Sequence, residues 1–253
     1  MMDIEALART VDDAATSARA IVQFSEALSE ADAYAVQAAS IARRIARGER
    51  RIGMKMGFTS RAKMVQMGVQ DMIWGRLTDR MLVEEGAAIR LDCYVHPRVE
   101  PELAFLIGKP LAGVVTHFEA RAAIAAIAPA MEIIDSRFQN FKFSLSDVIA
   151  DNASSAGVVI GSWSARDLDV SNLGMLMSFD GQPVQIGSSA AILGHPLRAV
   201  VAAARLAATA GESLNPGDIV LAGAATSAEA LRPGVHIRLE VEALGTAEFS
   251  VQA

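Results

Sequence analysis

Two glutamates separated by one proline lie in the segment VEPELAF, residues 99–105. If this segment is a strand, side-chain alternation puts Glu100 and Glu102 on one face, about 6.5–7 Å apart along the backbone. Two carboxylates on one face repel each other unless solvent, a proton or a cation relieves the repulsion. An oxygen-rich site of this kind suits magnesium, manganese or calcium. The alternative is a solvated edge strand with Pro101 marking the edge, and the spacing alone leaves both interpretations open.

A third carboxylate, Glu132, lies inside the apolar run 128–134. A carboxylate in such surroundings needs a partner, because an unpaired buried charge is costly. One interpretation is a buried ion pair with Arg137 or another base, and the other is a third ligand that completes a hard-metal site. Asp135 and Arg137 follow at once, and we expect them to form a local hydrogen-bonded pair that fixes a turn.

A single lysine, Lys55, lies between two methionines in a short segment bounded by Gly53 and Gly57. An exposed strand lysine is the ordinary explanation. If Lys55 points inward, burial is expected to lower its pKa, which would suit an acid or base, or a cation that binds an anionic substrate.

Small polar residues gather in the sequence DNASS, residues 151–155. Such a cluster is most often an Asx or Ser turn. The alternative is a binding loop in which Asn152, Ser154 and Ser155 present amide and hydroxyl groups to a carboxylate.

The elements that must position these residues are a mixture of helices and strands. Ser29 as an N-cap and three arginines before Gly48 predict a helix across this range. Short glycine-bounded apolar runs predict strands, and longer alanine-rich runs predict helices. The expected strands are Ile52–Phe58, Val99–Ile107, Val158–Ile160, Asp218–Leu221, His236–Ala243 and Ala247–Val251, and the other expected helices are Phe118–Ala128 and Pro196–Ala210.

This order indicates an α+β protein without regularly alternating strands and helices. We expect a helical N-terminal segment, residues 1–50, packed on a main catalytic domain, residues 51–253. The sequence contains neither GxGxxG nor a Walker-type loop, so it does not indicate a nucleotide cofactor.

Composition excludes several classes of protein. The 253 residues include 23 Lys+Arg and 29 Asp+Glu, a formal net charge of −6, and no basic run suited to nucleic acid. The one cysteine, Cys93, cannot form an intrachain disulfide, and the N-terminus lacks the pattern of a secretory signal, so we expect a cytoplasmic protein. The most apolar stretches are about half the length of a membrane span.

Several long segments together resemble the hydratase/decarboxylase branch of the fumarylacetoacetate hydrolase superfamily, whose members act on 2-oxo acids in catechol meta-cleavage pathways. The resemblance covers residues 55–79 (KMGFTSRAKMVQMGV, then WGRLTD), 96–105 (HPRVEPELAF), 131–161 and 194–223. It implies a mixed β-roll flanked by helices. It also implies a homo-oligomer or a complex with a sister hydratase.

The resemblance also implies site residues and a metal. Glu100, Glu102 and Glu132 would hold one divalent ion, magnesium or manganese, and Lys55 would lie over a small 2-oxo dicarboxylate substrate. The remaining matching pocket positions are Asp79, for which we expect a catalytic role, and Asn152, Ser154 and Ser155, which we expect to bind substrate.

Two reactions compete within this branch. Residues 134–143 resemble the enzymes that decarboxylate 2-oxohex-3-enedioate, whereas the hydratases that act on 2-hydroxypenta-2,4-dienoate usually carry Trp where Phe141 stands. The alternative explanation of Phe141 is plain core packing. The hydratase reaction is therefore the second hypothesis, and a non-catalytic partner subunit is the third.

Two departures from the family pattern concern the substrate more than the metal. Ala222 stands where members often carry Thr, so a hydroxyl that could bind a substrate carboxylate is missing, and Thr226 or Ser227 is expected to compensate. The usual Pro-Gly-Asp near the C-terminus ends in Val235 here.

Overall fold

The computed structural model describes residues 2–60, 64–65 and 71–253. The α-helices are α1 (Ile4–Ser17), α2 (Glu30–Ala46), α4 (His117–Ala123), α5 (Leu145–Ala150) and α6 (Leu197–Thr209). Short 3₁₀ turns are η1 (Asp79–Met81), η2 (Leu91–Cys93), η3 (Gln139–Phe141), η4 (Asn152–Ser154) and η5 (Ser189–Ala191). The predicted motif over residues 55–69 lies partly outside the described residues, at 61–63 and 66–69.

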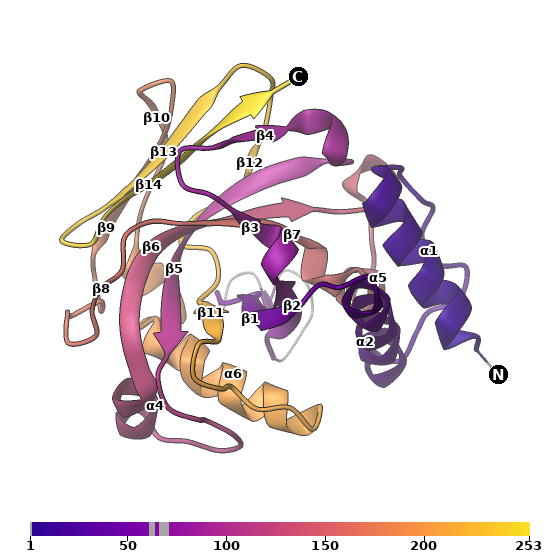
Figure 1. Cartoon of the computed structure of the whole chain (residues 1–253), viewed down its shortest axis with the longest axis horizontal. Helices are drawn as coiled ribbons and strands as arrows, with labels where there is room; N and C mark the ends of the chain where they lie inside the picture. The colour runs from indigo at the N-terminus through magenta and orange to yellow at the C-terminus, as the bar shows by residue number, and fades with distance from the viewer. Residues whose placement is uncertain (1, 61–63, 66–70) are drawn as a thin grey trace.

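Among the described residues, the larger of two sheets has nine strands, in the order β2-β1-β11-β5-β6-β7-β3, with β12 also pairing with β5 and β8 with β6. Its strands are β1 (Arg51–Gly57), β2 (Ile73–Thr78), β3 (Leu82–Val83), β5 (Pro97–Ile107), β6 (Ile124–Asp135), β7 (Ser155–Ile160), β8 (Ser164–Ala165), β11 (Ile219–Leu221) and β12 (Glu229–Ala230). The long antiparallel strands β5 and β6 curve through the middle of the molecule (Figure 1).

The second sheet has five strands in the described part of the chain, in the order β10-β9-β13-β14-β4. These are β4 (Ala88–Arg90), β9 (Gly174–Phe179), β10 (Gln182–Ser188), β13 (His236–Val241) and β14 (Gly245–Gln252). One continuous core joins the two sheets, because buried Phe105 and Met131 of the first belong to the same cluster as Leu239 and Phe249 of the second. Burial of these side chains makes the two sheets one packed body.

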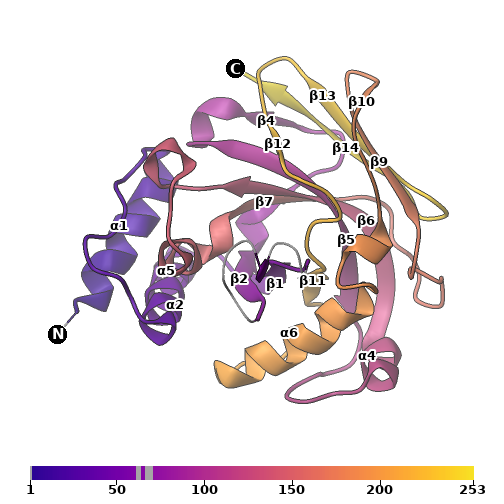
Figure 2. The ribbon, with the colours of Figure 1, turned by 180° about the vertical axis from the view of Figure 1, so that it is seen from behind.

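The helices divide into two groups. The helices α1, α2 and α5 lie together on one side of the strands, whereas α4 and α6 lie at the other end (Figures 1 and 2). Between α1 and α2, the buried carboxylate of Asp12 accepts hydrogen bonds from Arg43 and Arg47. A second apolar cluster joins Val11 and Val36 of these helices to Ile149 of α5.

Several predicted elements are confirmed with small shifts at their ends. The helix expected from Ser29 to Gly48 is α2, and the Ser29 hydroxyl accepts the N–H of Asp32 as predicted for an N-cap. The helix expected at 196–210 is α6, and the C-terminal strands are β11, β13 and β14. The mixed β-rich fold flanked by helices is therefore confirmed.

The helix expected at Phe118–Ala128 is wrong over its second half. A capping box between Thr116 and Glu119 begins α4, but the helix ends at Ala123 and Ile124 begins β6. The alanine-rich sequence looks helical, yet residues 124–135 are enclosed between β5 on one side and β7 and β8 on the other. Pairing on both edges outweighs the weak preference of alanine for a helix.

Candidate active site

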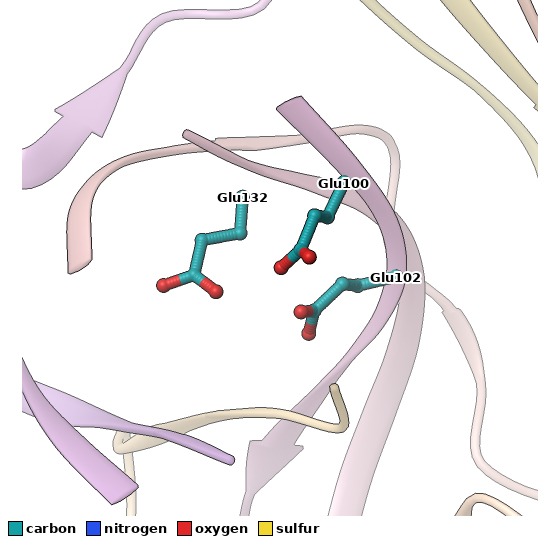
Figure 3. Close-up of side chains that lie close together, drawn as sticks. All are labelled: Glu100, Glu102 and Glu132. Carbon is teal, nitrogen blue, oxygen red and sulfur yellow. The ribbon is translucent and has the colours of Figure 1, made fainter. Parts of the chain in front are cut away.

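Three glutamates meet where β5 and β6 cross the middle of the larger sheet. Glu100 and Glu102 lie two residues apart on β5, and Glu132 of β6 is the cross-strand partner of Glu100. One carboxylate oxygen from each residue lies within 4.8 Å of the others. Figure 3 shows the three side chains pointing into one space. The shared face of Glu100 and Glu102 is confirmed, and strand register supplies the third carboxylate.

The alternative of a solvated edge strand is wrong. β5 pairs with β6 along one edge and with β11 and β12 along the other, and Glu102 and Glu132 are fully buried. Pro101 is tolerated because it falls between β11 and β12, where its carbonyl accepts the N–H of Ala225. Since the N and O of one antiparallel-strand residue face the same neighbour, the missing N–H of Pro101 faces this loop and leaves the β6 ladder intact.

Lys55 points inward from β1 and reaches the same cluster. Its Nζ lies 2.9 Å from Glu132 Oε2 and 3.0 Å from the carbonyl oxygen of Ala153, and only 3% of the residue is exposed. Burial alone would lower the pKa of Lys55, but the carboxylates of Glu132, Glu100 and Glu102 outweigh it, so the pKa is raised. The expected lowering of this pKa is therefore wrong, and Lys55 is an ammonium group in this arrangement.

The carboxylates are placed at high electrostatic cost. Burial is the main cause that raises the pKa of Glu102 well above its ordinary value, and the charge of Glu132 adds to it. Burial also raises the pKa of Glu132, although Lys55 opposes it. The N–H of Gly223 donates to Glu102 Oε2 at 2.7 Å, whereas Oε1 has no hydrogen-bond partner in the described part of the chain. Three convergent carboxylates with an unused oxygen fit a hard divalent cation.

The polar cluster at 152–155 divides into residues with different surroundings. Ser154 lines a cavity of about 480 Å³ beside Lys55 and Glu100, and its buried hydroxyl has no hydrogen-bond partner among the described residues. The Ser155 hydroxyl is buried and lowers the pKa of Glu132. Both polar atoms of the Asn152 amide are bonded to the backbone of Arg76, so this amide is not directed to a substrate.

Asp79 is not brought to the cluster. It lies on η1, where its carboxylate accepts the backbone N–H and the Nε of Arg50, which lower its pKa. Gly75 of β2 is the cross-strand partner of Lys55, and from there β2 runs away from the site. Asp79 follows Gly75 by four residues, a separation of about 13 Å by strand geometry.

The expected local pair of Asp135 and Arg137 is also wrong. Asp135 accepts the backbone N–H groups of Val95 and His96, whereas Arg137 forms a buried ion pair with Asp151. Arg137 is therefore not the ion-pair partner of Glu132.

A known protein family matches the part of the chain that forms this site. Residues 52–252, which include all the carboxylates and Lys55, match the family described as fumarylacetoacetate (FAA) hydrolase C-terminal. The chain belongs to the fumarylacetoacetate hydrolase family.

Relatives within the fumarylacetoacetate hydrolase family carry two kinds of name. The chain is 60% identical to a 4-oxalocrotonate decarboxylase of Pseudomonas sp, covering 98% of each sequence. It is 38% identical to a 2-keto-4-pentenoate hydratase of Paraburkholderia xenovorans (strain LB400), covering 85% of this chain and 81% of that one. Both names denote lyases, and this chain is a lyase of the same family.

A solved structure of a family member has the same fold. The 4-oxalocrotonate decarboxylase from Pseudomonas putida G7, complexed with magnesium and adipate, matches with a TM-score of 0.95 at 36% identity, covering 98% of this chain and 97% of that one. A second structure of that enzyme is complexed with calcium and acetate. Divalent cations thus occur in solved relatives, in agreement with the hard-metal chemistry of the glutamates.

Sequence reasoning about this family member missed one residue of the cavity wall. Arg98 lines the cavity, and its guanidinium carbon lies 4.5 Å from the ring centre of Phe141. The signal was available, because Arg98 precedes Glu100 by two residues on the same strand and so shares its face. Thr226 and Ser227, which were expected to compensate for Ala222, also line the cavity.

The remaining expectation concerns membranes. Among the described residues, the helices are all too short or too polar to cross a membrane.

Proposed function

We propose that this chain catalyses the divalent-metal-dependent decarboxylation of 4-oxalocrotonate (2-oxohex-3-enedioate) to 2-hydroxypenta-2,4-dienoate, in aromatic meta-cleavage catabolism. The observation that carries the proposal is the buried Lys55 ammonium beside three convergent glutamates, in a chain 60% identical to a 4-oxalocrotonate decarboxylase. A small 2-oxo dicarboxylate fits a cavity of about 480 Å³.

The reaction breaks the bond between C5 and the distal carboxylate. The electron pair of that bond moves through the conjugated alkene to the 2-oxo oxygen, and carbon dioxide leaves. One proton added to that oxygen gives the 2-hydroxydiene product. Glu100, Glu102 and Glu132 are the residues that would hold the divalent ion, which supplies Lewis-acid stabilisation of negative charge on the 2-oxo group when bound.

Lys55 acts on the substrate beside the divalent ion. Its ammonium group lies at the wall of the cavity with its charge maintained by Glu132, so it stabilises the negative charge that develops on the substrate. The same group can deliver the proton to the enolate oxygen and recover one from solvent. The unpartnered hydroxyl of Ser154 would donate to a substrate oxygen, and Ser155 would act beside it through Glu132. We assign no catalytic role to Asp79, which is bonded to Arg50.

The second candidate is hydration of 2-hydroxypenta-2,4-dienoate. It is favoured by relatives named 2-keto-4-pentenoate hydratase at 38% identity. The non-catalytic partner subunit is the least favoured, because a scaffold has no use for three convergent carboxylates that repel one another, two of them fully buried.

We also propose the division into an N-terminal helical segment, residues 1–50, and a catalytic domain, residues 51–253. The start of the family match at residue 52 and the shared apolar cluster of α1, α2 and α5 support it. A homo-oligomer or a complex with a sister hydratase stays part of this proposal.

The test is turnover of the two substrates by the purified protein, each with and without magnesium, followed by mass spectrometry. We expect magnesium-dependent release of carbon dioxide from 2-oxohex-3-enedioate. Glu100→Ala or Glu132→Ala should abolish it, whereas Glu240→Ala, a change at an exposed residue of β13, should not. Hydration of the diene without decarboxylation would support the second candidate, and silence on both would overturn both enzyme proposals.

A further inference from the structure

The turn η4 is built from three consecutive residues in a left-handed backbone conformation. The φ angles of Asn152, Ala153 and Ser154 are 51°, 50° and 59°. Residues with a Cβ avoid this region, and a run of three is unfavourable unless the surroundings hold it. The turn therefore has neighbours that impose its shape, and its position beside the cavity suggests what it is for.

The turn provides one of two contacts that fix the Lys55 ammonium. The carbonyl oxygen of Ala153 accepts a hydrogen bond from Lys55 Nζ at 3.0 Å, and Glu132 Oε2 lies 2.9 Å from the same nitrogen. A lysine side chain has four rotatable bonds, so a single carboxylate partner leaves its direction open. The second contact, from a carbonyl on a separate element, defines where the ammonium points.

The Asn152 side chain holds the turn against β2. Its Oδ1 accepts the backbone N–H of Arg76 at 2.7 Å, and its Nδ2 donates to the carbonyl oxygen of the same residue at 2.9 Å. Asn152 is only 5% exposed, and both halves of its amide are used by these bonds. Because both groups of this amide bond to the backbone, Asn152 fixes the position of the chain and does not bind a ligand.

Gly75 makes room for this arrangement. It is the cross-strand partner of Lys55 in the pairing of β1 with β2. A Cβ added to Gly75 would lie 2.4 Å from the carbonyl oxygen of Asn152, a backbone atom. The turn thus occupies the space beside Lys55 that a side chain at residue 75 would fill.

We propose that Asn152 is a positioning residue for Lys55, acting through the left-handed turn that it and Gly75 hold over the β1–β2 pair. This replaces the substrate-binding role expected from the sequence, and it rests on the proposed function in that Lys55 is the group that stabilises the reacting substrate. The positioning itself is a property of the chain without substrate.

Kinetics of Asn152→Gly give the first test. Glycine accepts the left-handed φ but removes both hydrogen bonds to Arg76, so the turn is released without new strain. We expect kcat to fall by about 100-fold, the size of effect that misplacing a catalytic group by about 1 Å produces. KM and magnesium affinity should change by less than about 3-fold. Gly75→Ala should produce the same pattern from the β2 side.

Gly174→Ala is the matched control. An added Cβ there meets only side-chain atoms of Glu242, the nearest at 3.5 Å, so kcat should be unchanged. Melting temperature measured for every variant separates loss of fold from loss of position.

A double-mutant cycle with Lys55→Met distinguishes positioning from general damage. If Asn152 acts through Lys55, adding Asn152→Gly to Lys55→Met should leave the residual rate unchanged. Multiplication of the two losses would overturn the proposal. If Asn152→Gly does not fold, Gly75→Ala takes its place in the cycle.

A crystal structure of Asn152→Gly completes the test without relying on activity. Loss of the hydrogen bond between Lys55 Nζ and the carbonyl of Ala153 supports positioning, and an unmoved ammonium overturns it. Should the wild-type protein turn over neither substrate, the proposed function fails, and this structure still decides whether Asn152 places Lys55.

Discussion

Glu102 shows at a single side chain the electrostatic cost of burying carboxylates in the site. It is fully buried, its pKa is raised by burial and by Glu132, and one of its oxygens has no hydrogen-bond partner among the described residues. Glu102→Gln removes the negative charge but keeps an oxygen that can accept the N–H of Gly223. We expect magnesium affinity, measured by calorimetry, to fall by at least about 10-fold, since even outer contacts to a metal ligand are worth that much.

The same substitution should act on stability in the opposite direction. Without divalent cations, removal of one like charge should raise the free energy of unfolding, measured in urea. Glu240→Gln should change neither quantity. Unchanged magnesium affinity in Glu102→Gln would mean that the cation does not bind at the three glutamates.

Some of the site could be predicted residue by residue. Strand alternation was enough to place Glu100 and Glu102 on one face. The pairing of Glu132 with Glu100 depends on strand register, and the partner of Arg137 depends on where a helix ends 14 residues later, so neither follows from local spacing. The pKa of Lys55 was mispredicted because its sign is decided by three charges that arrive from other strands.

At the scale of elements, α2 is hydrogen-bonded to β2 and to α5, the two elements beside the left-handed turn at residues 152–154. The Gln37 amide donates to the carbonyls of Trp74 on β2 and Ile149 on α5, and its oxygen accepts from Arg76. Gln37→Leu would leave two buried carbonyls and a guanidinium group without these bonds. We expect a loss of about 2–4 kcal/mol in the free energy of unfolding, measured by denaturant titration. Gln182→Leu, at an exposed residue of β10, is the control and should cost little.

The ion pairs between α1 and α2 should make part of the stability depend on pH. Burial would raise the pKa of Asp12, but Arg47 and Arg43 outweigh it, and the pKa lies below its ordinary value of 3.8. A lowered pKa in the folded state means that the ionised carboxylate stabilises the fold above that value, and this contribution is lost as the pH falls below it.

Asp12→Asn tests this dependence. Because both arginines are partly exposed, solvent screens the pairs, and we expect a cost of about 1–2 kcal/mol at pH 7. The difference in unfolding free energy between wild type and variant should shrink as the pH is lowered below 3.8. A difference that stays constant from pH 7 to pH 3 would contradict the assignment.

Elements with local signals were predictable and enclosed strands were less so. The N-cap of Ser29 and the arginines near the end of α2 are local, so that helix was predicted within two residues. Residues 124–128 carry helix-forming alanines, and only their enclosure between neighbouring strands makes them part of β6. No short window of sequence contains that information.

On the scale of the whole molecule, the site is assembled from distant parts of the chain. β1, β5, β6 and the turn at 152–154 each supply one side of it, and the loop after β11 supplies the N–H of Gly223. These elements hold three carboxylates together against their repulsion, and two of them, Glu102 and Glu132, are fully buried. The rest of the fold must therefore supply the stability that the site lacks, through the core shared by the two sheets.

A divalent cation should consequently stabilise the entire fold. A ligand that binds only the folded state adds about 2.7 kcal/mol at 100 times its dissociation constant. For a chain of this length that corresponds to a rise of about 5–10 °C in melting temperature. We expect this rise on adding magnesium to wild-type protein and to Glu240→Gln, and half of it or less in Glu102→Gln at the same concentration, because an affinity at least about 10-fold weaker leaves at most about 1.4 kcal/mol. An equal rise in all three would assign the stabilisation to magnesium bound elsewhere, because a cation held by the three glutamates cannot be indifferent to the loss of one of them.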